Sequence, residues 1–207
     1  MLDRRQFFAA SLFAATALGA APRFSNSLRA QGFPSEEDVY FDPDIPVLGN
    51  PNGDVTIAEF FDYQCPYCKK NHPELKKVVA SDRKIRLVMK DFPIFGKPSV
   101  YAANLVLASA ADGKYATAHD ALMNTPGRLS REDVDAVLKK AGLDPTDLYS
   151  KYKKNRSHID GIILRNMAQA NAFNLQGTPT FVIGRKIYPG YMNEKALKEA
   201  VAEARKS

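Results

Sequence analysis

Residues 55–68 read VTIAEFFDYQCPYC, and this stretch decides how the chain folds. Its first half, residues 55–61, is mostly apolar and rich in β-branched side chains, which is the pattern of a buried strand. Pro66 favours the first position of a helix. Cys65 and Cys68 are the only cysteines of the chain, and two residues separate them. The stretch therefore predicts a disulfide that forms and opens at a strand-to-helix junction.

A closely spaced cysteine pair has two other uses, a permanent structural disulfide and half of a zinc site. A structural zinc ion takes about four ligands, commonly including a second pair of cysteines or histidines. His72, His119 and His158 are scattered, and none has a second ligand at metal-type spacing. Redox chemistry is therefore preferred over both alternatives, and no metal or other cofactor is expected.

The first 30 residues are predicted to be a signal peptide and a following linker. The pair Arg4–Arg5 precedes a short stretch at residues 9–21 that is rich in Ala, Leu and Phe. A charged start followed by a short apolar stretch is typical of a signal peptide, and it is too short for a membrane span. The arginine pair indicates the twin-arginine export route, with an ordinary secretory signal as the alternative.

Export bears on both the charge and the redox chemistry of the chain. Cleavage is expected after Ala21 or near Ala30. The later cut removes four arginines and one aspartate, so the formal charge falls from +6 to about +3. The remaining basic residues are expected on solvated helix faces, which gives no reason to predict nucleic-acid binding. Because disulfides persist outside the cytosol, we predict a periplasmic protein. No cysteine directly follows the apolar stretch, so we expect no lipid anchor and no stable membrane anchor.

The order of the predicted elements indicates the fold class. Residues 31–50 contain three prolines and an acidic run, and they predict a polar N-terminal arm. Residues 51–207 predict one domain. After the redox helix, the patterns predict a strand at 84–90, helices from about 98 to 174, a hairpin at 180–188 and a last helix from about residue 193. This order predicts an α/β thioredoxin fold with a helical insertion between its two halves.

Cys65 is predicted to be the attacking thiol and Cys68 the resolving thiol. Exchange requires a thiolate, whereas a free cysteine is mostly protonated at neutral pH. Cys65 falls at the expected N-cap, where free backbone amides and the positive end of the helix lower the pKa of its thiol. Cys68 lies one turn further along. We therefore expect an exposed, acidic Cys65 and a more buried Cys68.

Glu59 lies within the otherwise apolar strand that leads to Cys65. A buried, unpaired acid is costly and has a raised pKa. One hypothesis is that Glu59 accepts or relays the proton of Cys68. The alternative is an acid on an edge strand that faces solvent. Pro73 is expected to kink the redox helix, and His72 beside it is expected at the surface.

Three motifs resemble the DsbA-like thioredoxin-fold family, and most of all its periplasmic ScsC/Com1-like branch. They are EFFDYQCPYC at 59–68, KDFPI at 90–94 and GTPTF at 177–181. The resemblance runs from about Val47 to the C-terminus. It implies thiol:disulfide exchange with cysteine-bearing exported proteins through Cys65 and Cys68, and reoxidation or reduction by a membrane redox partner. It also implies Glu59 as the family's buried acid.

The resemblance further implies a cis bond before Pro179, packed against the disulfide. Without it a trans bond is expected, because only about 5–6% of X–Pro bonds are cis. Thr178 and Pro179, together with Pro66 and Tyr67, are then expected to contact the substrate chain. The best-known oxidases of the family carry histidine where this chain has Tyr67. The net direction therefore stays open between oxidation and isomerisation or reduction.

The leading hypothesis is thus a protein-disulfide oxidoreductase, with oxidation as its main net reaction. One alternative is a periplasmic disulfide isomerase or reductase. Another is a copper-tolerance protein that binds Cu(I) through its two thiolates. A glutathione-dependent isomerase of small aromatic compounds does not need a C-x-x-C motif, so the intact motif argues against it. Assembly of isomerases of this type usually requires a long N-terminal helix. The prolines of residues 31–50 disfavour one, and we predict a monomer.

Overall fold

The computed structural model describes residues 34–206. Its centre is a mixed sheet of five strands in the order β1-β3-β2-β4-β5. The central strand, β2, runs parallel to β3 and antiparallel to β4. The strands are β1 (Val47–Gly49), β2 (Val55–Phe61), β3 (Ile85–Asp91), β4 (Thr180–Ile183) and β5 (Lys186–Pro189). The predicted strands and the late hairpin are therefore confirmed.

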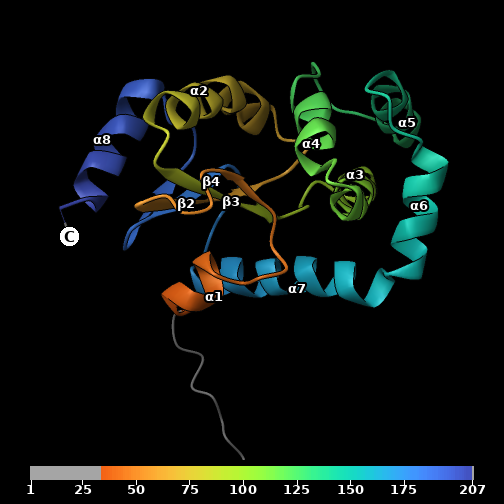
Figure 1. Cartoon of the computed structure of the whole chain (residues 1–207). Coiled ribbons are helices and arrows are strands. Elements are labelled where there is room, and N and C mark those ends of the chain that lie inside the picture. Colours follow the sequence, from red (N-terminus) through yellow and green to blue (C-terminus); the bar gives the residue numbers. More distant parts are fainter. Residues whose placement is uncertain (1–33, 207) are drawn as a thin grey trace, which may run out of the picture. The chain divides into compact units, whose positions relative to one another are not determined.

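Helices cover both faces of the sheet and one of its ends (Figure 1). They are α1 (Glu36–Tyr40), α2 (Pro66–Asp82), α3 (Lys97–Ala108), the 3-10 helix η1 (Ser109–Asp112), α4 (Tyr115–Met123), α5 (Arg131–Lys140), α6 (Pro145–Lys154), α7 (Arg156–Ala172) and α8 (Glu194–Ala204). α2 and α8 lie on one face, and α1 and α7 lie on the other. α3 to α6 gather beside the sheet.

The helices α3 to α7 form an insertion between β3 and β4, as the sequence predicts. Local capping explains where two of them begin. Ser130 and Asp133 form a reciprocal capping box at the start of α5, and the side chain of Asp144 accepts from the amide of Thr146 at the start of α6. These bonds satisfy amides that the helices themselves leave free. The fold class, a thioredoxin fold with a helical insertion, is confirmed.

The described part of residues 31–50 does not extend from the domain as an arm. α1 buries Val39 and Tyr40, and the following loop buries Ile45. β1 pairs antiparallel with β3 and completes one edge of the sheet. The hydroxyl of Tyr40 donates to the carbonyl of Gly184 at 2.5 Å. Residues 34–50 thus belong to the domain. Their few apolar residues are too widely spaced among prolines and acids to give a periodic signal.

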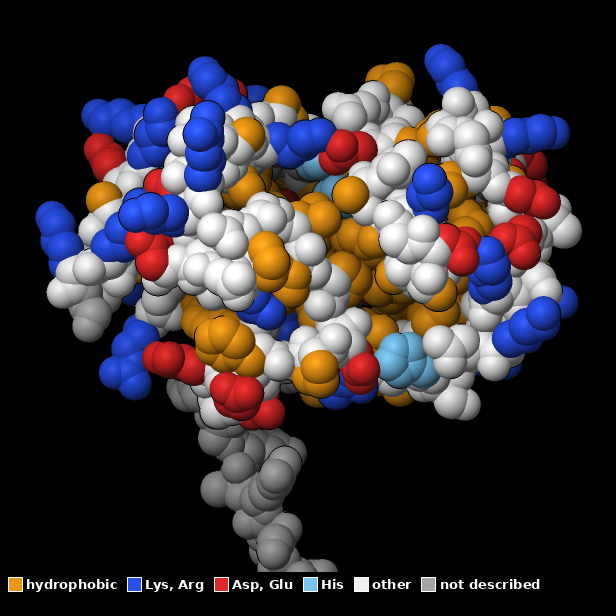
Figure 2. All heavy atoms as spheres, in the orientation of Figure 1, with side chains coloured by type: hydrophobic (Ala, Val, Ile, Leu, Met, Phe, Trp, Pro, Cys, Tyr) orange, Lys and Arg blue, Asp and Glu red, His pale blue; other side chains and the backbone are white. Residues whose placement is uncertain are grey.

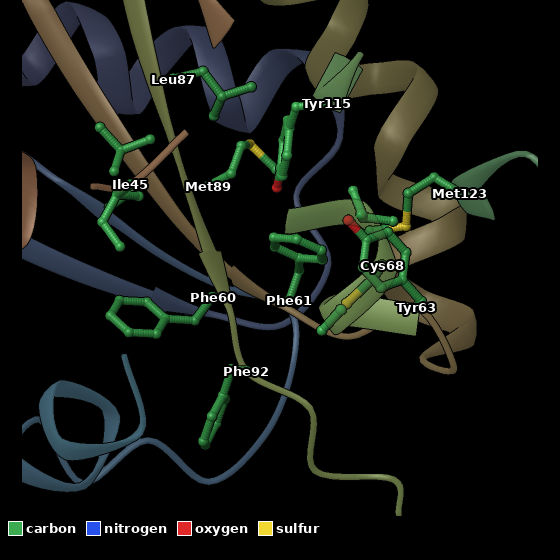
Figure 3. Packing of buried hydrophobic residues seen from close by; sticks show 14 of the residues in the cluster. Ile45, Phe60, Phe61, Tyr63, Cys68, Leu87, Met89, Phe92, Tyr115 and Met123 are labelled. Carbon is green, nitrogen blue, oxygen red and sulfur yellow. The ribbon is translucent and has the colours of Figure 1, made fainter. Parts of the chain in front are cut away.

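Alternation along β2 separates the core into two layers (Figure 3). Phe60 points to the α7 side, where its ring meets the edges of Phe92 and Phe173 at centroid distances of 6.4 Å. Phe61 points to the α2 side and packs against Tyr63 at 5.2 Å. Because side chains two residues apart share a face, Glu59 lies on the same side as Phe61. That is the side covered by the redox helix α2.

Two expectations concern the N-terminal end of the chain. The signal peptide, its twin-arginine pair and both candidate cleavage positions lie outside the described residues. Among residues 34–206, none of the helices has the length and apolar character that a bilayer-spanning segment needs.

Candidate active site

The start of α2 holds Cys65 where its sulfur meets free backbone amides. Cys65 is the N-cap, with φ −77° and ψ 117°, and Pro66 takes the first helical position. The amide of Cys68 donates to Sγ of Cys65 at 3.4 Å. This amide lies in the first turn of α2 and has no carbonyl partner within the helix. The sulfur of Cys65 therefore performs the capping that a serine or aspartate oxygen usually performs. The predicted N-cap position is confirmed.

The two thiols have opposite acidities. The pKa of Cys65 is lowered to about 6, first by a hydrogen bond from the side chain of Cys68, then by the side chain of Thr178 and the amides of Cys68 and Tyr67. Burial acts against this shift. The pKa of Cys68 is raised far above its ordinary value by burial, by its bond to Cys65 and by the charge of Glu59. At neutral pH the first thiol is therefore mainly a thiolate, and the second keeps its proton.

The loop before β4 closes over the same sulfur. The Thr178–Pro179 peptide bond is cis, as the family resemblance implies. The carbonyl of Thr178 accepts a hydrogen bond from the thiol of Cys65 at 3.1 Å. This contact favours the protonated form, whereas the side chain of Thr178 favours the thiolate. Gly190 donates to the carbonyl of Pro179 at 2.8 Å, so the loop is also tied to the end of β5.

The expected difference in exposure between the cysteines is wrong. Cys65 is 1% exposed and Cys68 is 0% exposed. Cys65 is covered because the Thr178–Pro179 loop lies against its sulfur, a contact that the local sequence around the motif does not reveal. What distinguishes the two cysteines is that hydrogen bonds lower the pKa of Cys65 despite burial, whereas burial is the largest cause that raises the pKa of Cys68. The exposed residues of the motif are Pro66 and Tyr67, and Tyr67 is 60% exposed.

Glu59 is buried beneath the redox helix. The residue is 1% exposed, and its Oε1 atom has no hydrogen-bond partner among the described residues. Its pKa is raised to about 8, mainly by burial and then by the charge of Cys65. Its position on a central strand rather than an edge strand contradicts the solvent-facing alternative. Glu59 therefore carries a proton at neutral pH on the side of the sheet that faces Cys68.

A cluster of buried polar rings between α2 and α4 was missed by the sequence analysis. His72 is 4% exposed rather than at the surface, and His119 is 1% exposed. Their ring centroids lie 5.1 Å apart, and burial lowers the pKa of both imidazoles. His72 Nε2 lies 3.0 Å from Asp120, within ion-pair distance but outside hydrogen-bond geometry. Figure 2 shows histidine atoms at the bottom of a hollow between the two helices.

Polar side chains around the motif tie neighbouring loops to it. Asp62 accepts from the amides of Ile94 at 2.7 Å and Phe95 at 3.0 Å. Gln64 accepts from the amide of Leu129 at 2.7 Å. Asp62 and Gln64 are both buried, which is unusual for such residues unless they are bonded. The only sequence signal for these bonds is the presence of two polar residues, Asp62 and Gln64, just before the cysteines. Their partners are 32 to 65 residues away, so local sequence does not identify them.

No metal centre is evident in the part of the chain that the structure describes. Within residues 34–206, histidine, cysteine, aspartate and glutamate side chains do not gather in any group of three that could hold a metal ion.

The fold and the site now place the chain in a family. A family model described as Thioredoxin matches residues 42–203, and the chain belongs to that family. A similar solved structure is a thioredoxin-like oxidoreductase from Silicibacter pomeroyi, at 37% identity and a TM-score of 0.80. The likeness covers 84% of this chain and 99% of that chain.

Two further solved structures confirm the resemblance to the DsbA-like and ScsC proteins. The thiol-disulfide exchange protein alpha-DsbA2 from Wolbachia pipientis is 30% identical, with a TM-score of 0.74 and coverage of 81% of this chain and 90% of that one. The catalytic domain of Proteus mirabilis ScsC is 25% identical, with a TM-score of 0.73 and coverage of 83% and 94%.

Curated relatives include much longer proteins. The chain is 28% identical over 169 residues to the Na(+)/H(+) antiporter NhaA 3 of Salinispora tropica. This match covers 80% of the chain and 26% of the antiporter, so the chain spans about a quarter of that relative's length.

Proposed function

We propose that this protein is a thiol:disulfide oxidoreductase that exchanges disulfides with exported proteins. The observation that carries the proposal is the asymmetry of the two sulfurs at the start of α2. The sulfur of Cys65 accepts the amide of Cys68 and lies 3.1 Å from the Thr178 carbonyl. Its pKa is lowered while that of Cys68 is raised. A low-pKa thiol beside a high-pKa thiol suits an attacking and a resolving cysteine.

In the oxidising direction a client thiolate attacks Sγ of Cys65 in the disulfide form. The Cys65–Cys68 bond breaks, a client–Cys65 disulfide forms, and Cys68 leaves with the electron pair and takes up one proton. A second client thiolate then attacks the client sulfur and releases Cys65 as a thiolate. The client loses two electrons and gains a disulfide. The same steps in reverse reduce a client disulfide. If a different client thiol attacks the client–Cys65 disulfide after such a reverse step, the client regains a disulfide between other cysteines and is isomerised.

Glu59 is proposed to hold or relay the proton that Cys68 gains and loses. Its raised pKa of about 8 means that it can both donate and accept near neutral pH. Its charge would otherwise oppose a thiolate on Cys68, and this repulsion contributes to the raised pKa of Cys68. Passing the proton between them keeps a single negative charge in the buried site.

The substrate chain is proposed to lie across the Thr178–Pro179 loop and the two residues between the cysteines. Pro66 and Tyr67 are the exposed part of the motif, and Tyr67 offers an aromatic surface beside Cys65. The Thr178 carbonyl already faces the sulfur, so an extended client strand placed there has its own sulfur near Cys65. Main-chain bonding of this type gives affinity without strict sequence choice.

The net direction is tested by the equilibrium of the Cys65–Cys68 pair against glutathione. A strongly oxidising potential supports net oxidation with a membrane partner as reoxidant. A mildly reducing potential supports the isomerase or reductase alternative instead. Titration of the reduced protein with Cu(I) tests the copper alternative. Tight stoichiometric binding together with slow exchange of client disulfides would favour it.

The compartment and the assembly follow from the same proposal. We infer a periplasmic protein, exported by the twin-arginine route, because its N-terminus has the composition of an export signal and its chemistry needs an oxidising compartment. Cysteine-bearing exported proteins are its proposed clients. Monomeric assembly is inferred for the mature chain, and light scattering tests it. A stable trimer would overturn that inference and revive the isomerase reading.

The role of Cys65 is tested by alkylating the reduced protein across a pH series and mapping the label. We expect modification of Cys65 with a midpoint near the pKa of about 6. The Cys65→Ser variant should lose this reaction, because the thiol of Cys68 stays protonated. Preferential labelling of Cys68 in the wild type would overturn the assignment, as would a midpoint near that of a free thiol.

A further inference from the structure

Loops from distant parts of the chain are fastened around Cys65 by buried polar side chains of the active-site segment. Asp62 binds the amides of residues 94 and 95, and Gln64 binds the amide of Leu129. Lys69 donates to the hydroxyl of Thr125 at 2.9 Å and to the carbonyl of Gly127. Asn71 accepts from the amide of Met192 at 2.7 Å. Each bond holds a surface loop next to the redox motif.

Together these loops form a rim around the reactive sulfur. We define the rim as residues 66–70, 94–97, 124–130, 176–179 and 189–193. Its sequence contains four basic residues and no aspartate or glutamate. They are Lys69, Lys70, Lys97 and Arg128. Of the acids that border the rim along the chain, Asp62 and Asp91 are buried, and Glu194 is paired with Lys77 and Lys198. Glu132 and Asp133 are exposed just beyond residue 130. The rim segments themselves therefore carry a net positive charge.

Two of these cations are held in place by aromatic rings rather than by acids. Nζ of Lys70 lies 4.6 Å from the ring centre of Tyr191, and the guanidinium of Arg128 lies 5.5 Å from that of Phe95. Within residues 34–206 neither cation forms an ion pair. A ring orients a cation but leaves its charge uncompensated. Both charges thus remain available to a partner.

The rim also offers apolar surface between the cations. Tyr67 is 60% exposed, Phe95 is 38% exposed and Tyr191 is 36% exposed. Exposed aromatic rings beside unpaired cations are typical of surfaces that bind polypeptides, since the rings supply contact area and the charges supply selectivity.

From this arrangement we propose that the protein selects client segments in which acidic residues flank the reacting cysteine. Lys70 and Arg128 attract the flanking carboxylates, and the rim repels segments with basic flanks. The proposal rests on the proposed function, because it concerns the step in which a client thiolate meets Cys65. It adds a preferred substrate class, which general thiol:disulfide exchange does not require.

The test uses three dithiol peptides that differ only in the residues flanking the first cysteine, namely glutamate, glutamine or lysine. Each is mixed with the oxidised protein. The peptide's two sulfurs lose two electrons and form a disulfide, and the Cys65–Cys68 disulfide gains them. One peptide proton ends on Cys68, and the other enters solvent when Cys65 remains a thiolate. Acid quenching and mass measurement follow both products. Rates with a small neutral disulfide correct for differences in peptide thiol pKa.

We expect the glutamate peptide to react at least about tenfold faster than the lysine peptide at low salt, the lower end of typical electrostatic steering. The ratio should approach one at about 1 M salt, where the Debye length is about 3 Å. The double variant Lys70→Glu with Arg128→Glu should reverse the order of the peptides. The ratio is measured within each variant, so changes in intrinsic thiol reactivity cancel.

The matched control is Lys153→Glu. Lys153 also lies over a ring, 5.2 Å from the centre of Tyr149, but on α6 and outside the rim. It should retain the wild-type ratio. Equal rates for all three peptides, or a ratio that the rim reversal leaves unchanged, would overturn the acidic-client proposal. Absence of exchange with every peptide and with dithiothreitol would instead overturn the proposed function.

Discussion

The Nδ1 atom of His119 lies 3.1 Å from the hydroxyl of Tyr63, although the two residues are 56 positions apart in the chain. Tyr63 belongs to the segment that enters the redox motif, and His119 belongs to α4 of the helical insertion. Both residues are 1% exposed. This bond is one of the few polar contacts that join the insertion to the active-site segment deep in the core.

Burial of His119 predicts that the domain loses stability as the pH falls. Its pKa in the folded protein lies well below its ordinary value of 6.5 because burial disfavours the charged ring. The unfolded chain therefore binds the extra proton first, and stability declines as pH falls below about 6.5. His119→Gln keeps a polar group near Tyr63 but does not titrate. Its free energy of unfolding should depend less on pH in this range.

Denaturant titrations of the reduced protein at several acidic pH values measure this dependence. The control variant is Tyr152→Phe, which alters another buried ring of the helical insertion. The hydroxyl of Tyr152 donates to Asp160 at 2.9 Å, outside the cluster that contains His119 and Tyr63. It should keep the wild-type slope. An unchanged slope in His119→Gln would show that other groups dominate the acid response.

Glu59→Gln should stabilise the reduced domain at alkaline pH and slow its chemistry near neutral pH. The folded pKa of Glu59 is about 8, against 4.5 in the unfolded chain. The stability that Glu59 contributes is complete at pH values below its pKa in the unfolded chain, and it is lost as the pH rises through its pKa in the folded protein. Replacement by a neutral amide removes that loss, by an amount on the order of a few kcal/mol above about pH 8. At acidic pH the two proteins should be nearly equal.

Acid-quenched exchange between the reduced protein and a peptide disulfide, in which Cys68 resolves the mixed disulfide, gives the second readout for Glu59. Resolution of the mixed disulfide should slow in Glu59→Gln near neutral pH, because Cys68 loses its proton acceptor. Rates equal to those of the wild type at that pH would assign Glu59 a purely structural role.

Asp62→Ala should release the loop at residues 94 and 95 more than it unfolds the domain. The carboxylate of Asp62 accepts from Gln64, Ile94 and Phe95 at 2.7, 2.7 and 3.0 Å. Unmaking buried bonds to a charged acceptor costs about 1–3 kcal/mol or more. Hydrogen exchange should accelerate selectively at the amides of Ile94 and Phe95. Uniform acceleration across the sheet would indicate a global effect instead.

Lys90→Met should raise the free energy of unfolding at neutral pH. Lys90 is 0% exposed, and its Nζ donates to the Asp38 carbonyl at 3.5 Å. Burial lowers its pKa to about 8. At neutral pH the folded state thus carries a poorly solvated charge, and an apolar side chain of similar length removes a penalty of about 1–3 kcal/mol. Thermal unfolding measures the change.

The Lys90 difference has a defined pH dependence. The folded pKa lies below the ordinary value of 10.5, so the penalty fades as pH rises between about 8 and 10.5. The advantage of Lys90→Met should shrink over that range. A variant that is less stable than the wild type at neutral pH would show that the contact with Asp38 outweighs desolvation.

Local signals were sufficient for the elements and for the redox pair. The N-cap position of Cys65 and the hairpin after Thr180 each depend on neighbouring residues, and each is confirmed. Glu59 could be singled out because an acid within an apolar strand is conspicuous, and its burial follows from the central place of β2.

Long-range contacts account for what the sequence analysis missed. The burial of Cys65 depends on Thr178, which is 113 residues away. The burial of His72 depends on packing against α4, whose side chains His119 and Asp120 complete the cluster. The short strand β1 showed no alternation of apolar and polar side chains in the sequence. Its three residues are held at the edge of the sheet by backbone pairing with β3, which does not require such alternation.

The contact between Cys65 and Thr178 also sets an order of events during synthesis. A chain that emerges N-terminus first presents both cysteines long before β4 exists. Until residues 178 and 180–183 have been made, Cys65 lacks the Thr178 carbonyl, and β2 lacks its antiparallel neighbour. Closing so long a loop is slow compared with forming α2. The nascent chain therefore presents Cys65 without the loop that covers its sulfur, and this sulfur becomes buried only when the full-length polypeptide folds.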